Sequence, residues 1–270
     1  MFNQPEENKD TEEIITPEAT IYLTPKSNPI SASANVMLVD AVQNASYLKK
    51  QPNNVIASYP VEITVKKKMV IKDDVEAAKI ELEKELRNSA EAQLKDQVLK
   101  MNREAGIELT LLTGENAIKF GDPKVSVDQS EVSGTIPAKG IAFNYNELVN
   151  ILETRLKLAK SPEKKLISVD TESITYRVIP IEAGADTTRQ IISATINGIE
   201  QYEINPAKEN GRRLIENIRS NVLGKSLVEA KNHIQQLPSI DKVTISNLPE
   251  SSSTLPLIPG SIIIEIVEEM

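Results

Sequence analysis

Residues 224–245 contain a complete helix followed by a strand, with both ends of the helix marked. Ser226 can accept a hydrogen bond from the free N–H groups of a helix start, and Glu229 can accept one from the N–H of Ser226, which is a capping box. Apolar residues then follow at helical spacing, namely Leu227, Ala230, Ile234 and Leu237. Pro238 cannot continue a helix, and after it Val243 begins an alternating, half-buried strand. The stretch predicts a helix packed on a sheet.

A second helix is predicted after Asp73 or Asp74, either of which can cap it. Its apolar residues recur at every fourth position: Ala78, Leu82, Leu86, Ala90, Leu94 and Val98. A step of four exceeds the helical period of about 3.6 residues, so this stripe winds round the helix. The pattern predicts either one long helix or two helices with a break after Asn88-Ser89.

The remaining apolar runs alternate with polar residues and predict strands. They occupy residues 20–24, 35–42, 61–65, 107–112, 117–120, 124–127, 131–136, 166–169, 173–179, 190–196 and 199–204, with a buried closing strand at 261–267. Asn197-Gly198 is a typical hairpin sequence and predicts a turn between two of them. Further helices are expected after Asn144 or Asn146 and over residues 206–222.

This order of elements predicts an α+β protein of several small modules, with helices on one face of mainly antiparallel sheets, as in ferredoxin-like or ring-building modules. Residues 1–18 are acidic and poor in large apolar groups, so we expect a disordered acidic tail. The expected modules are a small β unit at 19–70, an α+β module at 71–165, and a second α+β module at 166–270 that ends in the helix–strand unit and the C-terminal strand.

The composition excludes several classes of function. Aromatic residues make up 3% of the chain and tryptophan is absent, so the cores must be aliphatic and stacking platforms for bases are scarce. The net charge of −8 opposes binding to nucleic acid. No cysteine is present to supply a disulfide, a thiolate ligand or a thiol nucleophile. We therefore expect no nucleic-acid partner.

Residues that could support catalysis or bind a metal are isolated in the sequence. His233 is the only histidine, and the helical spacing places it away from the apolar stripe of its helix. Gly224-Lys225-Ser226 matches the end of a P-loop, but Arg219 stands where that motif needs its first glycine. Asp73-Asp74 at a helix start suits a cap better than a metal. We expect a protein that is not an enzyme, with no catalytic, cofactor-binding or metal-binding residues and no cofactor.

Two short motifs leave alternatives open. Lys66-Lys67-Lys68 is interpreted as a solvated strand end, with an anionic ligand as the alternative. Asn44-Ala45-Ser46 fits the glycosylation acceptor pattern.

The chain contains no apolar run of about 18 residues, and its first residues are acidic where a signal peptide is basic. A membrane contact is therefore expected only through a segment absent from this sequence.

The order of several phrases resembles the baseplate J-like proteins of Candidate Phyla bacteria. The phrases are ATIYLTPKSNPI, DDVEAAKIELEKEL, VSVDQSEVSGTIPAKGIAFNYNEL and GKSLVEAKNHIQQLPSIDKVTI, followed by a proline-rich loop and IIIEI. Together they span most of residues 19–267. Members of that family typically have a transmembrane helix before the first strand and a Gly-rich β domain in the middle, and this sequence lacks both.

The resemblance implies a structural or assembly protein of the cell surface or of a baseplate-like, contractile-tail-like assembly. Such a protein would act through protein partners, as a homo-oligomer or in a larger assembly, on the outer side of a membrane. The alternative is a POTRA-like or ring-building binding module of a secretion or envelope machine, because those modules share the helix–strand outline of residues 224–245.

Overall fold

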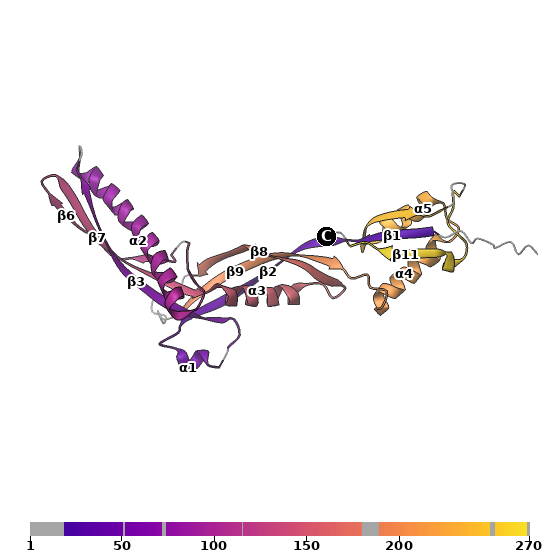
Figure 1. The fold of residues 1–270 in the computed structure, drawn as a ribbon, viewed down its shortest axis with the longest axis horizontal. Coiled ribbons are helices and arrows are strands. Elements are labelled where there is room, and N and C mark those ends of the chain that lie inside the picture. The colour runs from indigo at the N-terminus through magenta and orange to yellow at the C-terminus, as the bar shows by residue number, and fades with distance from the viewer. Residues whose placement is uncertain are drawn as a thin grey trace, which may run out of the picture. The chain divides into compact units, whose positions relative to one another are not determined.

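The computed structural model describes residues 19–50, 52–71, 74–114, 116–179, 189–248 and 252–268. The predicted disordered tail at residues 1–18 lies outside them. The fold is α+β, as predicted, and the chain divides into two compact units (Figure 1). Unit 1 comprises Met1–Asn28, Ser161–Ile167 and Ile199–Met270, and unit 2 comprises Pro29–Lys160 and Ser168–Gly198.

Unit 1 is built on a three-stranded sheet with β1 (Ala19–Pro25) at its centre. β1 pairs antiparallel with β10 (Ile240–Ser246) and parallel with β11 (Ile262–Ile266), which follows the short 3₁₀ turn η1 (Pro259–Ser261). Helices α4 (Glu209–Val222) and α5 (Leu227–Gln235) supply the rest of its core. The fully buried residues of that core are entirely aliphatic, as the composition predicts: Ala19, Ile21, Leu23, Ile218, Val222, Ala230 and Ile234.

The start of α5 confirms the predicted capping box. The backbone N–H of Glu229 donates to Ser226 Oγ at 3.3 Å, and the N–H of Ser226 donates to the Glu229 carboxylate at 3.1 Å. These hydrogen bonds to Ser226 hold the pKa of the Glu229 carboxyl below its usual value. Gly224 has a φ of +65°, a left-handed conformation that glycine adopts without strain.

Most of unit 2 belongs to a larger sheet with the strand order β4-β7-β3-β2-β9-β8, in which β5 and β6 also pair with β7. The strands are β2 (Ser27–Asp40), β3 (Val55–Val70), β4 (Leu109–Leu111), β5 (Lys119–Phe120), β6 (Lys124–Asp128), β7 (Glu131–Asn144), β8 (Lys164–Ile179) and β9 (Arg189–Tyr202). The helices are α1 (Ala45–Leu48), α2 (Val75–Ala105) and α3 (Tyr145–Ala159). β2 and β3 are parallel, whereas β3 and β7 form a long antiparallel pair.

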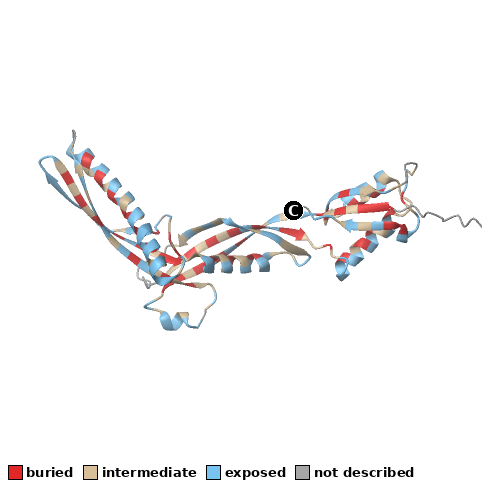
Figure 2. Ribbon diagram, viewed as in Figure 1, coloured by how far each residue is buried: buried red, intermediate tan, exposed pale blue. Residues whose placement is uncertain are grey.

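Helix α2 is unbroken, so of the two predicted alternatives the single long helix is correct. Asp74 caps it by accepting from the N–H of Glu76 at 3.0 Å, whereas Asp73 lies outside the described residues. All six residues of the predicted stripe are buried (Figure 2). Because a β-sheet is twisted, the direction in which its face points changes along the strands. A single helix whose apolar stripe winds round its axis can therefore keep contact with the sheet over its whole length.

The strands β3 and β7 present a close-fitting surface to α2. Every second residue of β7 faces the helix, and several of these residues are small, among them Gly134 and Gly140. The leucines of α2 can therefore approach the backbone of β7 closely. A Cβ built on Gly134 would lie 2.9 Å from Leu86 Cδ1, closer than carbon atoms normally pack. The core of unit 2 therefore depends on the match between leucines on α2 and glycines on β7.

The predicted hairpin at Asn197-Gly198 is wrong, because β9 runs without a break through both residues. The alternation of buried residues continues across the pair, from Ile196 to Gly198 and Glu200. The backbone N–H of Asn197 donates to Ser173 Oγ at 2.9 Å, on the neighbouring strand β8. Contacts with a neighbouring strand thus override a local turn signal.

Other boundaries also differ from the prediction. The two strands predicted at 166–169 and 173–179 are one strand, β8. The predicted buried strand at 261–267 is β11, which lies at a sheet edge and leaves Ile263 41% exposed. The division into two units also differs from modules 19–70, 71–165 and 166–270, because β3 pairs with β7 across the first of those boundaries.

The Asn102 side chain fixes β4 to the end of α2. Its Oδ1 accepts from the N–H of Leu109 at 2.8 Å, and its Nδ2 donates to the Leu109 carbonyl at 2.9 Å. Asn102→Ala should lower the free energy of unfolding by about 1–3 kcal/mol, because two partly buried backbone groups lose their partner. The matched control is Asn88→Ala at an exposed position of the same helix, where we expect little change. Equal effects of the two variants in urea denaturation would contradict this role of Asn102.

Candidate functional site

Helix α2 covers one face of the strands β3 and β7. The side chains of β3 and β7 that alternate with those buried under the helix lie on the opposite face. Because side chains alternate along a strand, Lys66 and Lys68 on β3 share this opposite face. Strand register places Thr135 of β7 opposite Lys66, and Ser133 opposite Lys68. The face therefore has a defined pattern of ammonium and hydroxyl groups.

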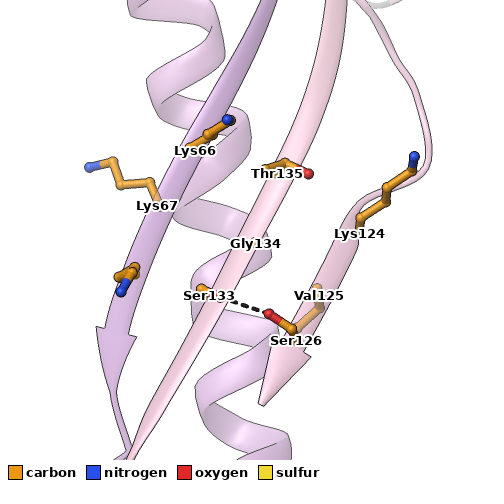
Figure 3. Close-up of a pocket in the computed structure, with 9 residues that line it drawn as sticks. Lys66, Lys67, Lys124, Val125, Ser126, Ser133, Gly134 and Thr135 are labelled. Carbon is orange, nitrogen blue, oxygen red and sulfur yellow. Dashed lines mark hydrogen bonds between the residues drawn. The ribbon is translucent and has the colours of Figure 1, made fainter. Parts of the chain in front are cut away.

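Strand β6 completes the pattern on the other side of β7. Lys124 lies opposite Thr135, and Ser126 lies opposite Ser133. Each row across the three strands thus reads Lys66–Thr135–Lys124 or Lys68–Ser133–Ser126. We call these six residues the lysine face. Figure 3 shows Lys66, Thr135 and Lys124 on three neighbouring strands, with Lys67 extending away from Lys66.

The lysine face is hollowed. These six residues, with their neighbours Lys67, Val125 and Gly134, line a depression of about 440 Å³. Within it the hydroxyls of Ser126 and Ser133 lie 2.8 Å apart and form a hydrogen bond. A Lys ammonium offers three donors, and a hydroxyl both donates and accepts, so the depression presents mostly donors to an approaching group.

The charges of the lysine face are only partly balanced by the protein itself. Lys68 has a carboxylate nearby, at 3.5 Å from Glu131, but both side chains are exposed and such a pair is weak. Within the described ranges, Lys66 and Lys124 have no carboxylate within 4.0 Å. In a chain with a net charge of −8, this face is a site of local positive charge.

A larger hollow of about 660 Å³ lies in unit 1, beside the start of α4. Its two cationic residues are already paired: Lys208 with Glu203 at 2.6 Å, and Arg213 with Glu209 at 2.5 Å. Such paired charges attract an external ion less than unpaired ones do. The lysine face is therefore the stronger candidate for a binding surface.

The residues that the sequence singled out for chemistry lie apart. His233 is half-buried on α5, and its buried Nε2 has no hydrogen-bond partner among the residues that the structure describes. Gly224-Lys225-Ser226 follows helix α4, whereas a P-loop follows a strand, so the motif here is a helix cap. In the part of the chain that the structure describes, no three His, Asp or Glu residues gather as metal ligands would.

The structure separates the three lysines that the sequence grouped together. The Lys67 ammonium lies on the helix side of β3 and pairs with Glu85 of α2 at 3.5 Å. Although Lys67 borders the depression, its charge is therefore turned away from that of Lys66. No pattern in the sequence pointed to Lys124, Ser126, Ser133 or Thr135, because only the strand register brings them to Lys66. Asn44 of the glycosylation motif is half-exposed just before α1, and its modification stays a prediction.

No model of a known protein family matches the chain, and no curated protein sequence matches it. The resemblance to baseplate J-like proteins therefore stays a prediction. Among the helices of the described residues, none has the length and the apolar character that crossing a bilayer requires.

Proposed function

We propose that this protein is a non-enzymatic structural or assembly component that acts through protein–protein contacts, at a cell surface or in a baseplate-like assembly. The lysine face is the observation that carries the proposal. It is a side of a helix-backed sheet, it is exposed over three strands, and two of its lysines lack a carboxylate from the described part of the chain.

The shape of the lysine face favours a broad partner. Its depression is shallow and lined by residues on neighbouring strands, whereas a small-molecule site is usually concave and encloses most of its ligand. The order of the phrases quoted above supports the same class of function, because it resembles structural proteins of the outer cell surface. A rigid sheet backed by the long helix α2 suits a contact surface, since little conformational freedom is lost on binding.

Mass photometry from nanomolar to micromolar concentration tests the proposal. At micromolar concentration we expect defined particles that contain two or more copies of the chain, because an assembly component has a surface that fits another subunit. A chain that stays monomeric at the highest concentration, and that captures an exported peptide instead, would contradict the proposal and favour a binding module of a secretion machine.

A further inference from the structure

We propose that the lysine face binds the acidic residues 1–18 of a second copy of this chain. The inference rests on the proposed function and specifies the contact by which copies associate. This segment is the expected occupant because the negative charge that complements the lysine face is concentrated in it.

The charge distribution along the chain supports this occupant. Residues 1–18 contain six acidic side chains, which are Glu6, Glu7, Asp10, Glu12, Glu13 and Glu18, and one basic side chain, Lys9. Their net charge of −5 is more than half of the −8 of the whole chain, and the other 252 residues carry −3. A segment with this charge is attracted to a lysine cluster more strongly than the rest of the surface is.

The dimensions are compatible with such a contact. The densest acidic run, Glu6 to Glu13, would span about 26 Å if extended, at about 3.3 Å per residue. Across the sheet, neighbouring strands lie about 4.8 Å apart, so the ammonium groups of Lys66 and Lys124 both lie within reach of one such segment. Thr135 lies between these two lysines and supplies a hydroxyl donor for the same carboxylates, and Ser133 supplies another in the neighbouring row.

The contact needs several ion pairs at once. An exposed lysine–carboxylate pair contributes little by itself, so the association depends on Lys66, Lys68 and Lys124 acting together on several carboxylates. Screening by salt weakens such pairs, since the Debye length falls to about 3 Å at about 1 M. We therefore expect an association that is strong at low ionic strength and weak at high ionic strength.

The segment and the lysine face are different surfaces of the chain, so the contact is heterologous. Each copy can give its segment to one neighbour and receive the segment of another. Repetition of such a contact closes into a ring or extends as a filament, depending on the rotation between copies. Either outcome is an assembly of the kind that the proposed function requires.

Three proteins test the inference by sedimentation velocity: the full chain, a variant that lacks residues 1–18, and the double variant Lys66→Glu/Lys124→Glu. The full chain should self-associate at low salt, and each variant should associate about tenfold or more weakly. A mixture of the two variants should form complexes that stop at two copies, because one variant keeps the face and the other keeps the segment. The matched control is Lys84→Glu/Lys100→Glu, which makes the same change of charge at exposed positions of α2 and should associate as the full chain does.

Each alternative result has a distinct meaning. Equal self-association of the full chain and both variants would overturn the inference and leave the proposed function standing. Loss of association in the lysine variant but not in the truncated chain would assign the face to another acidic surface, and would also overturn it. A full chain that is monomeric at every concentration would contradict both the inference and the proposed function.

Discussion

Leu86→Ala should lower the free energy of unfolding by about 2–5 kcal/mol, the largest effect that we expect from a single substitution in this protein. Leu86 is fully buried, and its side chain fills the space above Gly134 of β7, where a Cβ would lie 2.9 Å away. Truncation removes contacts with a backbone that cannot move in to replace them, because β7 is held between β3 and β6. The loss is therefore expected to include a cavity term in addition to the lost burial.

The matched control is Leu99→Ala on the same helix, where the leucine is 52% exposed. It should change the free energy of unfolding by at most about 0.5 kcal/mol, as surface substitutions usually do. Urea denaturation followed by circular dichroism measures both variants under the same conditions. Similar losses in the two variants would show that the leucine stripe does not hold α2 on the sheet.

Glu200→Gln should cost about 2–4 kcal/mol, because it removes the charge from a buried ion pair. The Glu200 carboxylate accepts from Lys164 Nζ at 2.7 Å and from the backbone N–H of Ser161 at 2.9 Å. The side chains of Glu200 and Lys164 are 8% and 12% exposed. Lys164 also lies over the ring of Tyr202, at 4.8 Å from its centroid, so the variant leaves an ammonium group in a poorly solvated place.

Glu216→Gln is the control for Glu200→Gln in the same unit. Glu216 pairs with Arg212 at 4.0 Å, and both side chains are more than half exposed. Because an exposed ion pair contributes about 0–1 kcal/mol, this variant should unfold almost as the unchanged protein does. Equal costs for the two variants would contradict a special role for the buried pair.

The effect of Glu200→Gln should depend on pH. The hydrogen bond from Lys164, helped by that from Ser161, lowers the pKa of the Glu200 carboxyl below its usual value of 4.5, although burial acts in the opposite direction. A lowered pKa in the folded state stabilises the fold above the usual pKa, and this stability is lost as the pH falls through the folded-state pKa. The difference in urea midpoint between the unchanged protein and the variant should therefore shrink on acidification from neutral pH to well below 4.5. A difference that is constant over this range would exclude ionised Glu200 as its cause.

The parts of the fold that the sequence predicted well are those with local signals. The cap at Ser226, the leucine stripe after Asp74 and the cap at Asn144 all depend on residues within a few positions of one another. The Asn197-Gly198 hairpin failed because pairing with distant strands decided the backbone there. Local rules describe a segment correctly when no stronger tertiary contact competes with them.

The lysine face could not be predicted because its residues meet through strand register. Lys66 and Lys124 are distant in sequence, and a shift of one residue in the pairing of β3 or β6 with β7 would turn one of them to the other side of the sheet. The run Lys66-Lys67-Lys68 was visible, but it gave no sign that Lys67 faces α2. A single sequence shows a cluster of charge along the chain, not the face on which each side chain lies.

The contact between the lysine face of one copy and residues 1–18 of another is the step on which the proposed assembly depends most. Carbodiimide cross-linking of a mixture of ¹⁵N-labelled and unlabelled chains, followed by mass spectrometry, tests it directly. We predict cross-links from Glu12 or Glu13 to Lys66 or Lys124 that join a labelled peptide to an unlabelled one. Cross-links of these carboxylates solely to other lysines, or solely within one chain, would contradict the account.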